Sequence, residues 1–238
     1  MEKEILIIKN ESREGPGLIK EVLEEHQAPY KIIDLQLGET LPPCEDFGAV
    51  VVLGGSDSAN DESVKIKSEI NYIQKILQAQ IPYLGICLGL QLLVKSSGGK
   101  VVKCPFKEIG FIDPKGQNFS VQLTEEGRKD QLFNNLEYSF NVFHLHGETV
   151  ELTKGMILLA TGSLCRNQIV KIGSNAYGIQ CHFELTNEMF ERWIKEDPDL
   201  IQLDRNQLRE SFSNIYDEYV RVGRQLFANF LKIADNKQ

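Results

Sequence analysis

The chain has 238 residues, of which 42% are hydrophobic and 25% are charged, as is ordinary for a globular protein. Its formal net charge of −8 offers no broad basic surface to phosphate groups, which argues against nucleic-acid binding. The apolar stretch near the N-terminus spans only residues 5–8, too short for the core of a signal peptide or for a membrane helix, so we expect no membrane association.

The first half of the chain alternates short apolar runs with amphipathic segments. Strands are predicted at residues 4–10, 31–35, 49–55 and 81–87. Between them, apolar residues recur at the spacing of one helix face. This alternation is typical of βαβ units, and it therefore predicts a mainly parallel sheet with flanking helices.

The pattern changes after Gly98 and Gly99. Short strands follow one another closely between residues 100 and 150, which predicts a small antiparallel excursion, with a helix at about 125–133. Further strands are predicted at 156–162, 168–173 and 176–183, and a helical pattern follows. We therefore predict one doubly wound α/β domain over residues 1–238, with a C-terminal helical extension over about 187–238.

The cysteines are odd in number, irregularly spaced and without a CxxC motif; there are five, at positions 44, 87, 104, 165 and 181. In a chain without a recognisable export signal, this pattern predicts reduced thiols and a cytoplasmic location. We expect most of these cysteines to be small buried hydrophobic side chains.

Cys87 stands out because the segment 85–89, Gly-Ile-Cys-Leu-Gly, lies where a predicted buried strand meets a helix. This is the form of a nucleophile elbow with cysteine in place of serine. The glycines allow close packing at a sharp turn, which presents the thiol at the carboxyl edge of the sheet. The N-terminus of the next helix favours the thiolate. The alternative is a buried cysteine whose neighbouring glycines serve packing alone.

A nucleophilic thiol needs a base, and His182 is the candidate. It ends the predicted strand at 176–183, and Glu184 lies two residues on. Residues i and i+2 of an extended chain share a face, so Glu184 can accept a hydrogen bond from the imidazole while Phe183 points away. A solvated surface His-Glu pair is the alternative, but the order Cys, His, Glu favours a catalytic triad.

Acyl transfer also needs hydrogen-bond donors for an oxyanion. The backbone N–H of Leu88 follows the candidate nucleophile directly. A second donor is predicted from the pair Gly54-Gly55, which ends the neighbouring strand and can turn its N–H groups into a cleft. An ordinary turn at the end of a strand is the alternative for these glycines.

These elements together resemble the class I glutamine amidotransferases, with the motifs in the order LGG (53–55), GICLGLQ (85–91) and GIQCHFE (178–184). More narrowly, the chain is similar to stand-alone members related to the glutaminase domain of GMP synthase. The segments that carry this likeness are EIGF (108–111), FHLHGE (143–148) and HFELTNEMFERWI (182–194). The resemblance covers roughly the whole chain and implies a flavodoxin-like fold.

The resemblance also implies roles for individual residues. Cys87 would be the nucleophile, His182 the general base and acid, and Glu184 the residue that orients the imidazole. Gly55 and Leu88 would supply the N–H groups of the oxyanion site. The residues implied in substrate binding are Gly54, Gln91, His146, Gly147 and Glu148.

The chain departs from the family pattern at three positions. Phe183 stands between His and Glu where members usually have proline, and Ser56 follows the glycine pair where proline is frequent. Neither change is expected to alter the chemistry. The third departure is Glu148, where aspartate is usual, and it bears on the identity of the substrate.

Two other histidines form an H-x-H pair, His144 and His146, on a predicted strand. A metal site would need further ligands at suitable spacing, and the sequence shows none. We therefore expect a structural or substrate-contact role for this pair and no metal. His26 ends a predicted amphipathic helix and is expected to face solvent.

The function that the resemblance implies is hydrolysis of the side-chain amide of glutamine through a γ-glutamyl thioester, without a cofactor. The chain has no Walker A loop and no GxGxxG motif, so ammonia either passes to a separate synthetase subunit or the enzyme acts alone. The alternative is a γ-glutamyl peptidase or hydrolase that uses the same triad. A non-catalytic regulatory subunit is a third hypothesis, against which the three intact triad residues argue.

Overall fold

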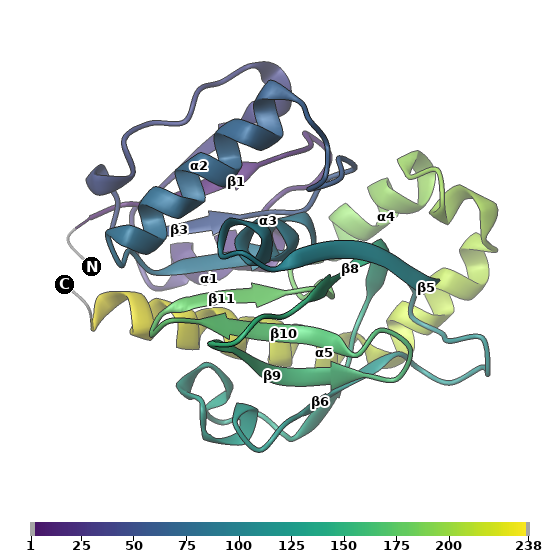
Figure 1. The fold of residues 1–238 in the computed structure, drawn as a ribbon. Coiled ribbons are helices and arrows are strands. Elements are labelled where there is room, and N and C mark those ends of the chain that lie inside the picture. The colour runs from purple at the N-terminus through teal and green to yellow at the C-terminus, as the bar shows by residue number, and fades with distance from the viewer. Residues whose placement is uncertain (1–2, 237–238) are drawn as a thin grey trace.

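The computed structural model describes residues 3–236, so positions 1, 2, 237 and 238 of the predicted domain lie outside the described residues. The main sheet has nine strands, and a separate sheet has two (Figure 1). Five neighbouring strands of the main sheet are parallel, in the order β2 (Tyr30–Asp34), β1 (Ile5–Lys9), β3 (Ala49–Val52), β4 (Tyr83–Ile86) and β11 (Ala176–Ile179). This arrangement confirms the predicted α/β class.

The main sheet continues beyond β11 through four antiparallel strands. Their order is β10 (Asn167–Ile172), β9 (Met156–Gly162), β6 (Ser120–Leu123) and β7 (Ser139–Asn141). The two-stranded sheet pairs β5 (Lys100–Gly110) with β8 (His144–Glu151), also antiparallel. The antiparallel part therefore comprises both the small sheet expected between residues 100 and 150 and an extension of the main sheet.

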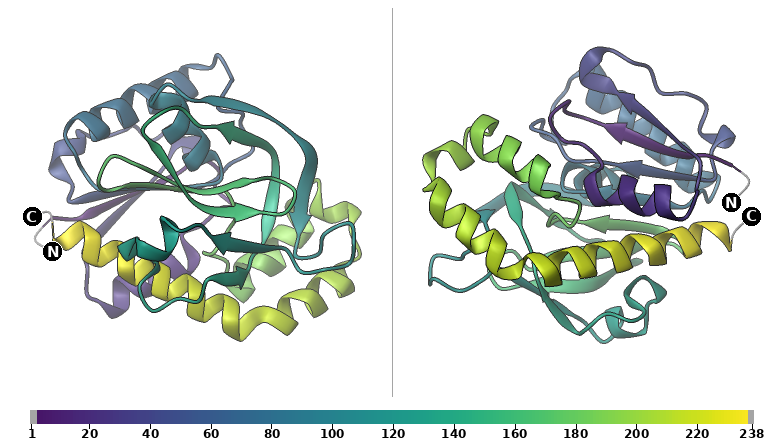
Figure 2. Two further views of the ribbon diagram at one scale, coloured as in Figure 1. Left: turned by 60° about the horizontal axis from the view of Figure 1, so that its bottom comes forward. Right: turned by 180° about the vertical axis from the view of Figure 1, so that it is seen from behind.

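Helices cover both faces of the parallel strands, because alternate strand residues point to opposite sides. Ile5 and Ile7 pack on one hydrophobic cluster together with α1 (Gly17–Glu25) and α5 (Arg205–Asp235). Leu6 and Ile8 pack on a second cluster with α2 (Val64–Gln78) and α3 (Leu88–Ser96). Figure 2 shows the long α5 running along the back of the sheet beside α1. The parallel half is therefore buried on both faces.

The C-terminal helices were expected and are present, as α4 (Asn187–Glu196) and α5. Each begins at a side-chain cap: the Thr186 hydroxyl accepts a hydrogen bond from the backbone N–H of Met189, and the Asp204 carboxylate accepts from Asn206 and Gln207. No helix within residues 3–236 is both long enough and apolar enough to cross a membrane.

The prediction of a helix at about 125–133 is wrong. Two short 3-10 turns occupy this stretch instead, Gly127–Lys129 and Gln131–Phe133. Asp130 separates them in an extended conformation, and its carboxylate caps the second turn by accepting from Leu132 N–H. A short aspartate side chain that bonds the nearby backbone competes with helix formation, which explains the difference.

Glu69 is a buried acid on α2, and it leads to a prediction about stability. Its side chain is 2% exposed, and neither of its carboxylate oxygens has a hydrogen-bond partner among residues 3–236. Burial raises the pKa of this carboxyl from 4.5 to about 7. Between these two pH values the folded chain holds a proton that the unfolded chain releases, so stability falls as the pH rises through this window.

We therefore expect Glu69→Gln to stabilise the protein at pH 8, by up to about 3 kcal/mol, since the pKa of the acid rises from 4.5 to about 7 and one pKa unit corresponds to about 1.4 kcal/mol. At pH 5 the substitution should change the free energy of unfolding far less, because the folded acid is then already neutral. Urea unfolding of both proteins at the two pH values tests this. An equal effect at both pH values would contradict the assignment.

Candidate active site

Cys87 lies between β4 and α3, at the carboxyl edge of the parallel strands. Its backbone has φ 51° and ψ −104°, a conformation that residues with a side chain rarely adopt. A Cβ on Gly85 would lie 2.4 Å from the backbone of Gly89, and one on Gly89 would lie 2.3 Å from the carbonyl oxygen of Val52. The sharp strand-to-helix turn is therefore confirmed, and both glycines are required by close backbone approach.

His182 lies beyond the end of β11, which is shorter than the predicted strand. Its backbone N–H donates to the carbonyl oxygen of Phe143 at 2.9 Å, and its own carbonyl oxygen accepts from the Tyr219 hydroxyl at 3.0 Å. The imidazole is 1% exposed and makes edge-to-face contacts with the rings of Phe143 and Trp193. Packing and hydrogen bonds thus fix both its backbone and its ring.

Glu184 shares a face with His182, as predicted from their spacing. The Oε1 atom of Glu184 lies 2.6 Å from His182 Nδ1, and its Oε2 accepts from the backbone N–H of Phe183 at 2.9 Å. Phe183 itself points into the hydrophobic core. Glu184 thereby assigns the proton of the neutral imidazole to Nδ1 and leaves Nε2 available.

The electrostatics of His182 suit a proton acceptor. Burial alone would lower the pKa of the imidazole, but the Glu184 carboxylate and the Cys87 thiol raise it well above 6.5. Nε2 is buried and has no hydrogen-bond partner among residues 3–236, while the thiol makes a long contact of 3.8 Å with the carbonyl oxygen of Leu145. The structure therefore brings together the thiol, the imidazole and the carboxylate that the sequence singled out.

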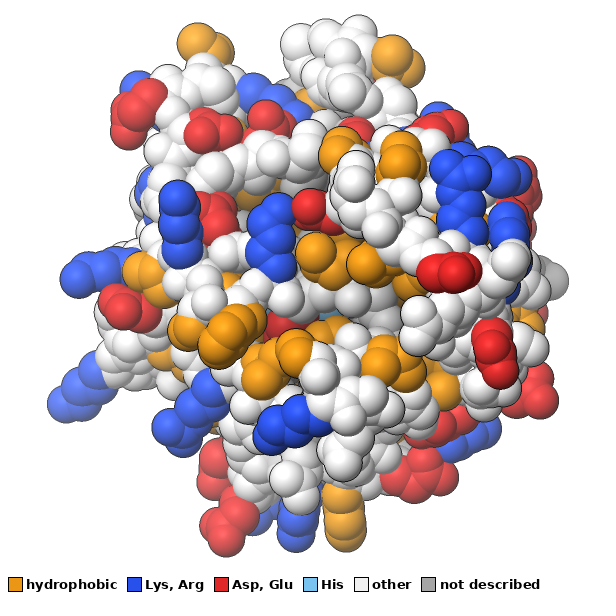
Figure 3. Space-filling view, turned by 90° about the vertical axis from the view of Figure 1, so that its right-hand side faces the viewer, with side chains coloured by type: hydrophobic (Ala, Val, Ile, Leu, Met, Phe, Trp, Pro, Cys, Tyr) orange, Lys and Arg blue, Asp and Glu red, His pale blue; other side chains and the backbone are white. Residues whose placement is uncertain are grey.

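The thiol opens into a cavity of about 460 Å³. Lys107 of β5 and the segment 197–199 after α4 line part of the cavity, and Figure 3 shows this side of the molecule as a face of mixed acidic, basic and apolar side chains around a hollow. The predicted residues that line it are Gly55, Cys87, Gln91, His146, Gly147 and Glu148. Gly54, Leu88, His182 and Glu184 lie behind the cavity wall rather than on it.

The candidate oxyanion residues belong to two different elements, and a Cβ on Gly55 would lie 3.4 Å from Leu88 Cδ2. Gly55 is on the cavity wall, and a Cβ there would lie 2.7 Å from Asn10 Cβ. Leu88 is the first residue of α3, where backbone N–H groups lack partners within the helix. Gly54 packs beside the triad: a Cβ there would lie 2.3 Å from Glu14 Oε2 and 3.4 Å from His182 Cε1.

The residues implied in substrate binding are tied together by hydrogen bonds. Gln91 Nε2 donates to the carbonyl oxygen of Glu148 at 3.2 Å, and the carboxylate of Glu148 accepts from the Ser58 hydroxyl at 2.8 Å. His146 Nδ1 lies 3.0 Å from the same Glu148 carbonyl, and its Nε2 lies 2.9 Å from Glu108 Oε2. These hydrogen bonds therefore hold this wall of the cavity in place without a bound substrate.

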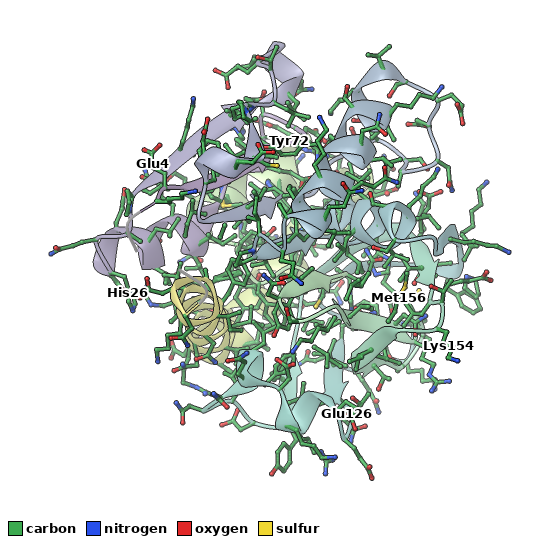
Figure 4. The ribbon with its side chains drawn as sticks, turned by 60° about the vertical axis from the view of Figure 1, so that its left-hand side comes forward. Glu4, His26, Tyr72, Glu126, Lys154 and Met156 are labelled. Atoms are coloured by element: carbon green, nitrogen blue, oxygen red, sulfur yellow. The ribbon has the colours of Figure 1, made fainter. Side chains whose placement is uncertain are left out.

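The other two histidines do not reach the cavity. His144 is buried next to His146, and burial lowers its pKa to about 3, so it is neutral. His26 lies exposed at the end of α1, as expected, on the side of the molecule shown in Figure 4.

Several charged residues of the cavity were missed by the sequence reasoning. Arg13 pairs with Asp197 at 2.7 Å, and Lys107 pairs with Asp199 at 2.9 Å, all four on the cavity wall. Glu14 lines it too, and burial raises the pKa of its carboxyl to about 7. Its position after the first strand, at the carboxyl edge, was the signal that could have identified it.

An α/β sheet that presents a thiol, an imidazole and a carboxylate at one strand-to-helix turn is a framework for thiol-dependent amide hydrolysis. The model of the family "Glutamine amidotransferase class-I" matches residues 18–197. The chain therefore belongs to the class I glutamine amidotransferases, which confirms the resemblance found in the sequence.

Relatives and solved structures agree with this assignment. The chain is 31% identical over 194 residues to a glutamine amidotransferase-like protein of Salmonella typhimurium, YfeJ, covering 79% of this chain and 78% of the relative. It is 28% identical to one subunit of the glutamine-hydrolysing GMP synthase of Sulfurisphaera tokodaii, covering 63% of this chain and 77% of that relative. It also matches GMP synthases of which it spans only 25–26%. The crystal structure of a glutamine amidotransferase from Thermotoga maritima has a TM-score of 0.85 at 27% identity, covering 97% of this chain and 99% of that one.

Proposed function

We propose that the protein hydrolyses the side-chain amide of glutamine, with Cys87 as the nucleophile, His182 as the general base and acid, and Glu184 as the residue that positions the imidazole. The observation that carries this proposal is the buried Glu184–His182 pair, with an unpaired Nε2 beside a thiol held at a strained turn. An imidazole that is held by a carboxylate through one nitrogen and has its other nitrogen beside a thiol is the arrangement that proton transfer from the thiol requires.

In the proposed reaction the thiol transfers its proton to His182 Nε2 and attacks the γ-carbonyl carbon of glutamine. The backbone N–H groups of Gly55 and Leu88 stabilise the oxyanion. The imidazolium then protonates the leaving ammonia, and a γ-glutamyl thioester remains on Cys87. Water activated by His182 hydrolyses the thioester, which releases glutamate and regenerates the thiol.

The wall formed by Gln91, His146, Gly147 and Glu148 is proposed to hold the amino-acid end of the substrate. Ser58 is hydrogen-bonded to the Glu148 carboxylate, so the extra methylene of this side chain relative to aspartate is accommodated within the wall. Support for a separate acceptor protein comes from the Sulfurisphaera tokodaii relative, which is itself named as one subunit of its synthase. The cytoplasmic location stays a prediction from the cysteine pattern.

A γ-glutamyl peptidase is the second candidate, and the charged part of the cavity favours it. Beyond the thiol, the wall carries the Arg13–Asp197 and Lys107–Asp199 ion pairs, which offer both signs of charge to a larger leaving amine. The leaving group of free glutamine is ammonia, which is too small to contact these ion pairs.

The test is to incubate the purified protein with free glutamine and, separately, with γ-glutamyl dipeptides, and to measure glutamate together with the released ammonia or amino acid. Equal amounts of glutamate and ammonia establish the glutaminase, whereas a strong preference for dipeptides establishes the peptidase. A glutamine analogue with a diazoketone in place of the amide gives a readout that needs no partner protein. We expect it to alkylate Cys87, as peptide mapping would show, and failure of both substrates and of labelling would contradict the proposal.

A further inference from the structure

Two cysteines outside the triad lie in direct contact beside the candidate active site. Cys104 belongs to β5, and Cys165 lies in the turn between β9 and β10, 61 residues along the chain. Their Sγ atoms are 2.7 Å apart. Cys165 is buried, whereas Cys104 is half-buried and so can be reached from solvent. The fold therefore places one accessible and one protected sulfur within bonding reach of each other.

A buried cation lies next to this pair. His146 Nε2 lies 2.9 Å from Glu108 Oε2 and its Nδ1 lies 3.0 Å from the carbonyl oxygen of Glu148, so both ring nitrogens face acceptors. Burial alone would lower the pKa of His146, but Cys104 and Glu108 raise it to about 9. The resulting imidazolium has Nδ1 only 3.6 Å from Cys104 Sγ. It is thus placed to stabilise a negative charge on that sulfur.

The two sulfurs are consequently unequal. The hydrogen bond from the Cys165 thiol, together with His146, lowers the pKa of Cys104 to about 6 against the effect of burial. The same hydrogen bond and burial raise the pKa of Cys165 well above its usual value, and Glu108 contributes in the same direction. At neutral pH the pair is a thiolate that accepts a hydrogen bond from a thiol.

We propose that Cys104 and Cys165 form a redox-active dithiol that small-molecule disulfides such as oxidised glutathione convert to an intramolecular disulfide. The Cys104 thiolate attacks one sulfur of the disulfide, which forms a mixed disulfide and releases one glutathione thiolate. The Cys165 sulfur, losing its proton to solvent, then attacks Cys104 Sγ and releases the second. The Cys104 thiolate and the Cys165 thiol thus give up two electrons and one proton, and the oxidant leaves as two glutathione thiolates.

A metal site is the competing use of the same residues, because Cys104, Cys165 and His146 also lie within ligating distance of one another. Two observations favour the dithiol. The Nδ1 atom of His146 faces the Glu148 carbonyl at 3.0 Å, so it carries a proton and cannot ligate a metal. Two thiolates on one tetrahedral zinc ion, each with a bond of about 2.3 Å, lie about 3.8 Å apart, farther than these sulfurs.

The dithiol is also connected to the proposed substrate wall. His146, which contacts Cys104, lines the cavity and is bonded to Glu148. Oxidation removes the negative charge that faces the imidazolium, while Glu108 remains on its other side. Oxidation of the pair would therefore change the charge beside His146, a residue of the cavity wall, without a change at Cys87.

The experiment treats the reduced parent protein with oxidised glutathione at pH 7, alkylates the remaining thiols, and maps the modified peptides by mass spectrometry. We expect a linked Cys104–Cys165 peptide that dithiothreitol reverses. In Cys165→Ser the glutathione should stay on Cys104 as a mixed disulfide, and in Cys104→Ser the buried Cys165 should remain a free thiol. Cys44→Ser, at a buried free cysteine in the 3-10 turn Cys44–Asp46, should leave the linkage unchanged.

The central measurement uses the parent protein, so it does not depend on the folding of any variant. Recovery of Cys104 and Cys165 as free thiols after the treatment, with glutathione found only on Cys87, would overturn the proposal. Stoichiometric zinc in the purified protein, lost in Cys104→Ser and Cys165→Ser but kept in Cys44→Ser, would overturn it in favour of a metal site. Neither outcome bears on glutamine hydrolysis, which is measured separately.

Discussion

Replacing Cys87 with alanine is expected to abolish the release of glutamate and ammonia, with kcat lowered by at least about 10⁴-fold. The thiol is the only proposed atom that bonds to the substrate, and no other described cysteine lines the cavity. Alanine has a Cβ like cysteine, so it must adopt the same positive φ, and the strain at the turn is unchanged. The loss would therefore reflect chemistry and not a change of backbone.

The measurement compares the initial rates of glutamate formation by the parent protein, Cys87→Ala and Cys44→Ser, each with its free energy of unfolding. Cys44 is also buried and also lost as a thiol, but it lies outside the cavity, so its variant should keep the parental kcat. Turnover by Cys87→Ala at the parental rate would show that another group attacks the amide.

The second large effect is expected for Glu184→Gln, with kcat lowered by about 10³–10⁴-fold, as is found when the carboxylate of a triad becomes an amide. Both carboxylate oxygens accept hydrogen bonds, one from His182 Nδ1–H and one from the backbone N–H of Phe183. Glutamine has one acceptor oxygen, so its NH₂ group must face one of these donors. Either the imidazole turns to the wrong tautomer or a buried N–H loses its partner, which costs about 1–3 kcal/mol of stability.

The pH dependence separates positioning from mere loss of structure. Glu184 helps to raise the pKa of His182 above 6.5, so the stability that this interaction contributes is fully present below pH 6.5 and is lost as the pH rises through the folded pKa. In Glu184→Gln this dependence should largely disappear, and the imidazole pKa followed by NMR should fall. Glu188→Gln, at an exposed position in the first turn of α4, is the control and should change neither the rate nor the imidazole pKa. An unchanged pH–rate profile for Glu184→Gln would refute the proposed positioning role.

Much of the parallel half was predictable because its signals are local. Each strand is a short apolar run, and the elbow is a set of consecutive residues at 85–89 whose glycines have a steric reason. The contact between His182 and Glu184 was predictable for the same reason, since it follows from a two-residue spacing. The failed helix at 125–133 shows the limit of this reasoning, since one capping aspartate, Asp130, was enough to break it into two turns.

Contacts between distant elements could not be read from local patterns. Arg13 meets Asp197 only because the loop after β1 and the end of α4 converge on one edge of the sheet. Most of the five cysteines were expected to be small buried hydrophobic side chains, and the sequence singled out neither Cys104 nor Cys165; only the crossing of β5 with the turn after β9 makes them a pair. No periodic pattern and no motif in the sequence indicates either contact.

The pairing of β4 with β11 also has a consequence for how the protein folds. It brings the side chain of Gln180 to within 3.7 Å of the Cys87 sulfur across 93 residues of sequence. Contacts of such separation require closure of a long loop, which slows folding in chains rich in them. We therefore expect the candidate site to form after the local β1–α1 and β4–α3 units, so that recovery of the proposed glutamate release during refolding would follow the pairing of β4 with β11.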